Sequence, residues 1–306
     1  MDIIINIDKP EDISSHQAVI KVKRLFAAKK AGHAGTLDPI ATGVLIVCLN
    51  EATKITRFLS DLNKEYIVRL KLGERTDTYD STGRLIEKRD CGAVKESDLQ
   101  EILKNFTGRI KQTPPMYSAV KIDGRPLYKL ARKGIEIERP ERDIHIYKID
   151  PLSFQQPYLD LRVNCSKGTY IRTLCDDIGN ALGSGAHMTS LKRTRVGDFR
   201  IEDSVSMDEF RQINFACCSI DSALSHLDEI ILDEASYRRA RNGMPIPLLM
   251  NNSDSIFAKE NRGMPNNLYI DQYVRLKTPA NILFGIGRKE GHNIKIERLL
   301  GISSEN

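Results

Sequence analysis

The segment over residues 32–47 constrains the fold most, because a loop of small residues delivers one acidic side chain and then enters an apolar run. The glycines of this loop permit backbone angles that other residues avoid, and Pro39 biases Asp38 toward an extended conformation. The pattern predicts a carboxylate at the lip of a pocket, followed by a buried strand over residues 43–49. An Asp-Pro pair near glycines is also typical of a plain turn.

Hydrophobic periodicity predicts helices and strands that mix without a regular βαβ rhythm over residues 1–228. A helix is predicted to begin at Ser97, because Ser97 and Gln100 have the spacing of a capping box. This mixture favours an α+β fold over a doubly wound one. The other predicted helices cover residues 16–28 and 170–182, and further strands cover residues 66–72 and 159–165.

The sequence pattern changes from about residue 229, where short strand candidates separated by turn residues follow one short helix. We therefore expect two domains, over residues 1–228 and 229–306, the second small and rich in β-structure. Its helix is predicted over residues 233–241, and its strands over residues 246–249, 269–276, 282–287 and 294–300.

Composition excludes some classes of protein and leaves others open. The 46 basic and 41 acidic residues give a net charge of +5, which neither demands nor excludes a polyanionic partner. The six cysteines have neither C-x-x-C nor zinc-finger spacing. The first residues lack a signal-peptide pattern, and no apolar run is long enough to span a bilayer. We expect a reduced cytoplasmic protein with no membrane partner.

Basic residues cluster after a proline-containing segment. Lys129, Arg132 and Lys133 follow helical i, i+3, i+4 spacing, which puts three cations on one helical face. With Lys121 and Arg125 nearby, the cluster is typical of a phosphate-contacting patch, although a solvated helix face has the same pattern. Further cations, Lys192, Arg193 and Arg195, lie in the segment over residues 185–197.

An arginine near a predicted helix start offers a partner for the carboxylate. Tyr170 and Arg172 lie two apart at a Gly-Thr helix start. Because an arginine does not deprotonate, Arg172 is suited to hold Asp38 ionised and to lower its pKa. The alternative is an ordinary surface pair with Asp176 at i+4.

Taken together, these segments closely resemble the bacterial TruB family of tRNA pseudouridine synthases. The motifs are Gly-Thr-Leu-Asp-Pro, the strand that begins Lys64-Glu65-Tyr66, and the segments over residues 112–134, 165–174 and 185–197. The resemblance runs from about residue 7 to 197, and the C-terminal part is more loosely similar to a PUA RNA-binding module. One departure is Asp12, where the family usually has glycine.

The resemblance implies a mixed, mainly antiparallel sheet flanked by helices, with a thumb-like insertion over about residues 112–140 that closes over RNA. It implies that Asp38 is the catalytic nucleophile and that Arg172 orients it. Tyr66 is implied to pack against the target base and to assist proton transfer. The other implied substrate contacts are His33, Tyr170 and Leu191, and the implied contacts to the RNA backbone are Lys121, Arg125, Lys129, Arg132, Lys133, Lys192 and Arg193.

The activity that the resemblance implies is isomerisation of uridine to pseudouridine at position 55 in the T arm of tRNA, on a flipped-out base. No metal, cofactor or guide RNA is implied, and the protein is expected to act as a monomer. His33 is implied to fill the gap left in the RNA loop or to contact the flipped nucleotide.

Three alternatives remain at this point. A tRNA-binding chaperone would keep the basic residues but would not need Asp38, Tyr66 and Arg172 together. A guide-dependent synthase of the Cbf5 type is disfavoured by the thumb-like segment. A hydrolase with an aspartate dyad would need Asp77 or Asp80 as second carboxylate, whereas Asp77 more simply makes a turn.

Overall fold

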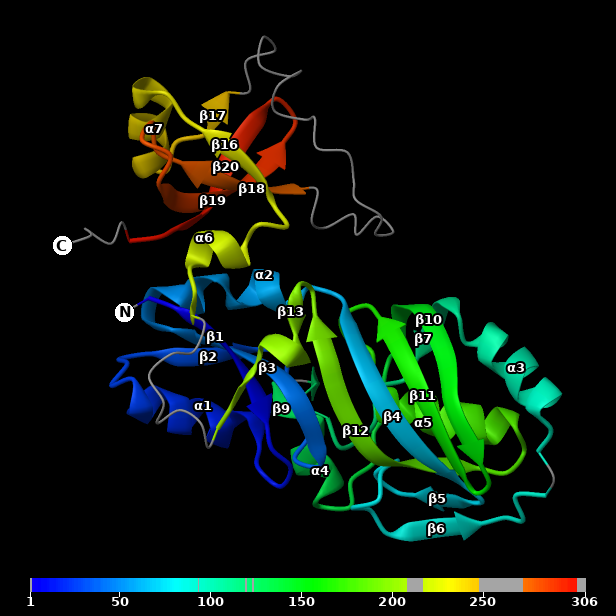
Figure 1. Cartoon of the computed structure of the whole chain (residues 1–306). Coiled ribbons are helices and arrows are strands. Elements are labelled where there is room, and N and C mark those ends of the chain that lie inside the picture. Colours follow the sequence, from blue (N-terminus) through cyan, green and yellow to red (C-terminus); the bar gives the residue numbers. More distant parts are fainter. Residues whose placement is uncertain are drawn as a thin grey trace.

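The computed structural model describes residues 2–92, 94–118, 120–122, 124–207, 217–247 and 272–301. A large sheet with helices forms one part, and a smaller sheet lies at one end of it, beyond α6 (Figure 1). The expected α+β architecture with a small C-terminal β module is confirmed. Among the described residues, no helix combines the length and apolar character that a membrane crossing needs.

The large sheet is mixed and mainly antiparallel, as expected. Its main path runs β14-β1-β3-β12-β4-β11-β10-β7, and the parallel pairs in it are β1 with β14 and β3 with β12. The strands are β1 (Ile4–Lys9), β2 (Ala31–Ala34), β3 (Ala41–Leu49), β4 (Lys64–Leu72), β7 (Gly108–Gln112), β10 (Arg142–Gln155), β11 (Tyr158–Cys165), β12 (Ala186–Val196), β13 (Phe199–Arg200), β14 (Val205–Ser206) and β15 (Cys217–Cys218).

Three helices pack against this sheet, and their apolar residues join one core with its inner face. They are α1 (Ser15–Leu25), α3 (Glu96–Asn105) and α5 (Ile171–Ala181). Smaller elements are η1 (Asn50–Ile55), α2 (Thr56–Ser60), the hairpin β5 (Glu74–Thr76) with β6 (Leu85–Lys88), and η2 (Ile201–Asp203). The thumb-like segment contributes β8 (Lys121–Ile122), β9 (Arg125–Pro126) and α4 (Leu127–Ala131).

The helix caps differ from the prediction. Helix α1 begins after Ser14, whose hydroxyl accepts from the backbone N–H of Gln17 while the Gln17 side chain accepts from the backbone of Ser14. This capping box satisfies two donors that a helix start leaves unpaired. The capping box predicted at Ser97 is wrong, because Ser97 lies inside α3, which begins after Lys95 without a side-chain cap.

The smaller sheet has the strand order β16-β18-β19-β20-β17 and carries α7. Predicted strands over residues 246–249 and 269–276 lie partly outside the described residues, and the domain boundary after residue 228 stays a prediction. The elements are α6 (Ile220–Ala223), β16 (Asp228–Ile231), α7 (Glu234–Arg241), β17 (Ile246–Pro247), β18 (Tyr273–Lys277), β19 (Leu283–Glu290) and β20 (Asn293–Leu299).

The smaller sheet is packed against α2. The Arg57 guanidinium donates to the Tyr273 hydroxyl over 3.1 Å and pairs with Glu297. Phe58 meets the Tyr273 ring edge to face, with ring centroids 5.1 Å apart. Apolar side chains of both parts share one buried cluster. The contact is therefore a packed interface and not only a connection through the chain.

The capping box gives a stability prediction with an internal control. Ser14→Ala removes the hydroxyl that caps α1, so we expect the free energy of unfolding to fall by about 1 kcal/mol. Ser97→Ala removes an exposed hydroxyl that donates a hydrogen bond to the side chain of Asp98 and caps no helix, so we expect a change within about 0.5 kcal/mol. Urea denaturation of the two variants checks both values, and an equal loss would contradict the assignment of the cap.

Candidate active site

One cavity of about 840 Å³ brings together residues that lie far apart in the sequence. Its lining combines the Asp38 loop, β4, β12, the start of α5 and the thumb-like segment. It is large enough to enclose a small organic group among polar and apolar side chains. The predicted site residues that line it are Asp38, Tyr66, Arg132, Tyr170, Arg172, Leu191 and Arg193.

The backbone on both sides of Asp38 is fastened to the rest of the protein. The buried Ser15 hydroxyl donates to the Leu37 carbonyl over 2.9 Å and accepts from the Leu37 N–H over 2.8 Å. On the other side, the Pro39 carbonyl accepts from the Asp12 N–H over 3.0 Å and from the Lys9 ammonium over 3.3 Å. These bonds fix where the Asp38 side chain leaves the chain.

Asp12 takes the backbone conformation that suits a glycine. Its φ is 63°, in the left-handed region where glycine carries no steric penalty and aspartate is among the better tolerated residues. The departure from the family pattern at this position therefore keeps the loop shape that holds Pro39.

Arg172 lies between two carboxylates. Its guanidinium is 3.5 Å from an Asp38 oxygen and 3.4 Å from an Asp80 oxygen, and it also donates to the Tyr117 carbonyl. The second Asp80 oxygen accepts from the hydroxyls of Thr78 and Thr82. Because Arg172 and Asp80 are almost fully buried, their partners offset part of the cost of removing both charges from water.

The predicted pairing of Asp38 with Arg172 is found, but the predicted direction of the pKa shift is wrong. Burial of the carboxylate raises the pKa of Asp38 above its usual value, Arg172 opposes that shift, and Asp80 adds to it. The desolvation cost of the charged form exceeds the attraction to one guanidinium shared with a second carboxylate. The Asp38 side chain is still 37% exposed, because it opens into the cavity.

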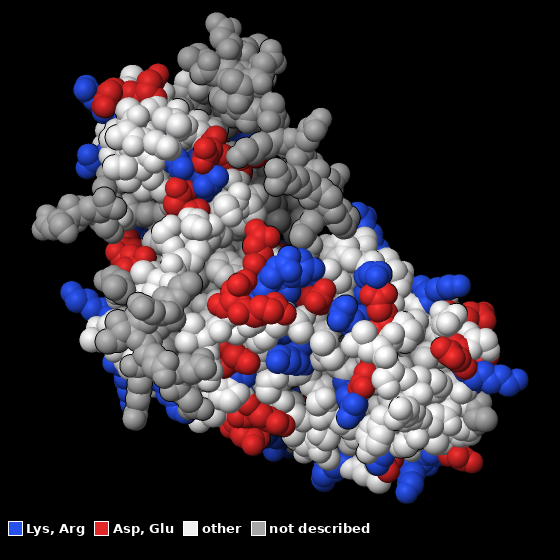
Figure 2. Space-filling view, in the orientation of Figure 1, with Lys and Arg blue, Asp and Glu red and all other residues white. Residues whose placement is uncertain are grey.

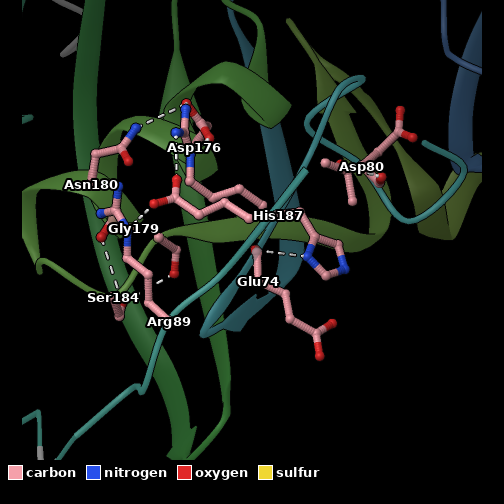
Figure 3. Close-up of polar contacts among 12 residues, drawn as sticks. Glu74, Asp80, Arg89, Asp176, Gly179, Asn180, Ser184 and His187 are labelled. Carbon is pink, nitrogen blue, oxygen red and sulfur yellow. Dashed lines mark hydrogen bonds and ion pairs between the residues drawn. The ribbon is translucent and has the colours of Figure 1, made fainter. Parts of the chain in front are cut away.

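The alternative partner of Arg172 is engaged elsewhere. Asp176 receives two hydrogen bonds from the Arg75 guanidinium, over 2.8 and 3.1 Å, and one from the Asn180 amide over 3.0 Å. Figure 3 shows Asp176 together with Asn180, while Asp80 lies on a separate loop. The surface pair between Arg172 and Asp176 is thus excluded.

One wall of the cavity is a face of the sheet. Tyr66 on β4 is paired in register with Arg193 on β12, and Val68 is paired with Leu191, so these side chains share one face. Tyr66 and Leu191 are less than one-tenth exposed. Burial raises the pKa of the Tyr66 phenol, while the charge of the neighbouring Arg193 opposes that shift.

Arg193 does not lie on the surface, as a contact to the RNA backbone requires. It is 1% exposed, and its guanidinium donates to the Val44 carbonyl over 2.7 Å and to the Gly35 carbonyl over 3.0 Å. Its neighbour Lys192 is exposed, because successive residues of a strand point to opposite faces. The sequence-based expectation for Arg193 is therefore corrected, and that for Lys192 stays a prediction.

The start of α5 is held by a residue that sequence reasoning did not select. The buried Gln112 amide accepts from the Tyr170 N–H over 2.8 Å and donates to the Tyr170 carbonyl over 3.1 Å. Both polar groups of the Tyr170 backbone are thereby satisfied beside the cavity. Tyr170 is the residue before α5, so this clamp also fixes the turn that carries Arg172 into the site.

His33 lies on β2 and is not among the residues that line the cavity. Its Nδ1 is buried without a hydrogen-bond partner among the residues that the structure describes, and burial lowers the pKa of its imidazole. A predicted contact between His33 and a flipped nucleotide stays a prediction.

The predicted basic patch is divided between the cavity and the surface. Arg132 stacks its guanidinium over the Tyr128 ring at 5.6 Å, and both side chains line the cavity. Arg125, Lys129 and Lys133 are exposed, and the side chain of Lys121 lies outside the described residues. On the face drawn in Figure 2, basic and acidic side chains are interspersed, so this face is no uniform basic surface.

Ser15, Asp80 and Gln112 were missed by sequence reasoning as site residues. The sequence offers Asp80 only as the second carboxylate of a hydrolase, whereas the structure shows that it binds Arg172 across 92 positions of sequence. Ser15 and Gln112 act through the backbone of other residues, so their types and spacing carry no signal of the partner. A serine and a glutamine buried in apolar surroundings are a general sign of such partners.

Comparison with known proteins identifies the family that the sequence motifs resemble, and the matches extend over nearly the whole chain. The TruB family pseudouridylate synthase N-terminal domain matches residues 23–171, and the tRNA pseudouridylate synthase B C-terminal domain matches residues 172–234. The tRNA pseudouridine synthase B of Clostridium tetani is 41% identical over 302 residues, covering 98% of this chain and 100% of that protein. The Haemophilus influenzae protein of the same name is 40% identical, with 98% and 95% covered.

A solved structure extends the likeness to the fold. A chain of a Cbf5-Nop10-Gar1 complex superposes with a TM-score of 0.71 and 27% identity, covering 97% of this chain and 84% of the matched chain. The likeness therefore includes the large sheet together with the C-terminal module.

Because the folded-state pKa of Asp38 is raised, the ionised carboxylate destabilises the fold at neutral pH. The folded state binds this proton more tightly than the unfolded state, so the unfavourable contribution grows as pH rises above the unfolded pKa of 3.8. We expect Asp38→Asn to unfold at a higher temperature than the wild type at pH 7. The difference should shrink toward pH 4, as measured by calorimetry across pH. A lower unfolding temperature at pH 7 would mean that the pair with Arg172 outweighs the burial cost.

Proposed function

The chain belongs to the TruB family of tRNA pseudouridine synthases, and on that premise we propose that it isomerises uridine 55 in the T arm of tRNA with Asp38 as the nucleophile. The observation that carries this proposal is the Asp38 carboxylate, which opens into the cavity while Arg172 holds it from behind. A positioned carboxylate is suited to form a transient covalent bond that divides one difficult step into two.

The reaction breaks the bond between C1′ of the ribose and N1 of uracil and forms a bond from C1′ to C5. One proton leaves C5 and one proton is gained at N1, so neither an oxidant nor an external nucleophile is needed. Any bond that Asp38 makes to the ribose or the base must break again before product leaves. We propose that Arg172 keeps the Asp38 carboxylate ionised and aimed through this cycle.

The cavity must receive a base that has left its stack, because the glycosidic bond of a stacked uridine is inaccessible. We propose that Tyr66 packs against that base and assists proton transfer, and that Tyr170 and Leu191 form the walls around it. The mixed polar and apolar lining of the cavity supports this assignment. Tyr128 offers a further aromatic face, next to the Arg132 cation.

The partners and the setting belong to the same proposal. We propose that the protein acts in the cytoplasm as a monomer on tRNA without a guide RNA, and that residues 229–306 form a second RNA-binding domain. The thumb-like segment, whose α4 borders the catalytic cavity, supports direct contact with the substrate RNA.

The first test is tritium release from a tRNA transcript labelled at uridine C5. Pseudouridine formation at one site must release one equivalent of label per tRNA. We expect release by the wild type and none by Asp38→Asn, with tRNA affinity nearly unchanged, because only the nucleophilic oxygen is lost. Release by both proteins would remove Asp38 from the mechanism. Tight tRNA binding without release by either would favour a tRNA-binding chaperone.

The second test concerns the exposed cations of the thumb-like segment. If Lys129, Arg132 and Lys133 each neutralise a phosphate, their triple replacement by glutamine should weaken tRNA binding. It should also reduce the slope of log K against log salt by about 2 to 3. Chemistry at saturating tRNA should be reduced less than affinity.

A control variant removes two exposed cations outside the thumb-like segment. Lys95 directly precedes α3, and Lys104 lies in its last turn. We expect Lys95→Gln/Lys104→Gln to leave the salt slope as in the wild type. A triple variant with the wild-type slope would mean that the basic cluster is a solvated helix face.

A further inference from the structure

Arg193 is a buried cation whose charge is not matched by a carboxylate. Among the described residues, no aspartate or glutamate oxygen lies within 4.0 Å of its guanidinium, whereas Arg172 in the same cavity has two such partners. The hydrogen-bond acceptors of Arg193 are the neutral carbonyls of Val44 and Gly35, and the neutral Tyr66 phenol belongs to its direct partner on the neighbouring strand. A buried charge without a counter-ion is costly, and such a cost is typical of functional sites.

The geometry connects Arg193 to the reaction through the phenolic oxygen of Tyr66. Arg193 and Tyr66 are directly paired on neighbouring antiparallel strands, β12 and β4, with both side chains on the cavity face. Arg193 has only donors, so the phenolic oxygen is the one atom of the Tyr66 side chain that can accept from it. The phenolic proton is then free to point into the cavity.

We propose that Arg193 is a positioning residue for the proton transfer assigned to Tyr66: it turns the phenolic proton toward the bound base and stabilises the phenolate that forms once that proton is given away. This inference rests on the proposed function of the site. Arg193 also holds the backbone carbonyls of Val44 and Gly35. The proposed role is distinct from this structural one.

Such a phenolate closes the proton balance of the reaction. Tyr66 gives its hydroxyl proton to the uracil nitrogen released from C1′, which leaves a phenolate. The phenolate then takes the hydrogen from C5 after the new bond to C1′ has formed. One proton has moved from C5 to N1, and the tyrosine ends as it began. A negative charge exists at the Tyr66 oxygen only between these two steps, and there the Arg193 charge gains its missing counter-ion.

The test compares single-turnover pseudouridine formation in tRNA that carries protium or deuterium at uridine C5. We expect Arg193→Gln to slow the reaction by about 10²-fold or more, the loss typical of one charge-stabilising donor. Its C5 deuterium isotope effect should exceed that of the wild type, because removal of the C5 hydrogen becomes slower. An unchanged isotope effect would overturn the proposal and leave Arg193 with a structural role.

The control variant is Arg200→Gln, which makes the same chemical change at an exposed side chain of β13. We expect its rate and isotope effect to match the wild type. If Arg193→Gln does not fold, Arg193→Lys serves instead: it keeps the charge but not the planar donor group, so a smaller slowing with a raised isotope effect is expected.

A double-mutant cycle with Tyr66→Phe separates the two roles of Arg193. If Arg193 acts through the Tyr66 oxygen, Arg193→Gln should slow the Tyr66→Phe enzyme by less than about 3-fold, because interacting residues are not additive. Equal slowing in both backgrounds would overturn the proposal. Should Tyr66→Phe have no measurable turnover, the isotope effect decides alone. Failure of the proposed function has a different signature, since the wild type would then form no pseudouridine.

Discussion

The site depends on one electrostatic arrangement, in which a single guanidinium is shared by two carboxylates. Arg172 holds Asp80 on its buried side and Asp38 on the side of the cavity. The Asp80 carboxylate also accepts hydrogen bonds from two threonine hydroxyls, whereas the Asp38 carboxylate opens into the cavity. The sharing leaves Asp38 with less stabilisation than a pair of its own would give, so burial still raises its pKa. A carboxylate held in this way is available for chemistry because it is not fully satisfied.

The rest of the fold serves to keep that carboxylate in place. Ser15, presented by the capped start of α1, fixes the residue before Asp38, and Lys9 with the backbone of Asp12 fixes the residue after it. Lys9 is itself buried, and burial lowers its pKa to about 8. On the opposite wall, Gln112 fixes the turn that carries Arg172. Helix α1, β1 and β7 thus contribute to the site through backbone contacts at some distance from its chemistry.

Much of this arrangement was predictable from local sequence, and the failures have physical reasons. Asp38, Tyr66, Tyr170, Arg172 and Leu191 come from motifs, and the structure brings them to one cavity. Asp80 follows a turn, and only tertiary folding brings it to Arg172. Lys192 and Arg193 look equivalent as a basic pair, but a strand alternates its faces, so one is exposed and the other is buried. Recognising the strand over Ala186–Val196 would have separated them. The sign of the Asp38 shift depends on burial, which no local pattern supplies.

The charges around the cavity determine how a bound polyanion would act on the site. Besides Arg172, the loop and the sheet face bring Lys9, Lys64 and Arg193, whose direct partners are neutral oxygens. Asp38 and Asp80 are the carboxylates that line the cavity with Lys64, Arg172 and Arg193, so these side chains leave an excess of positive charge there when Lys64 is protonated. Burial lowers the pKa of Lys64 to about 7, so its charge is the one most easily lost as pH rises. A polyanion entering the cavity would favour the protonated form of Lys64 and disfavour ionised Asp38. Such binding would keep Lys64 protonated, and Arg172 would then have to oppose a larger shift of Asp38 toward its neutral form.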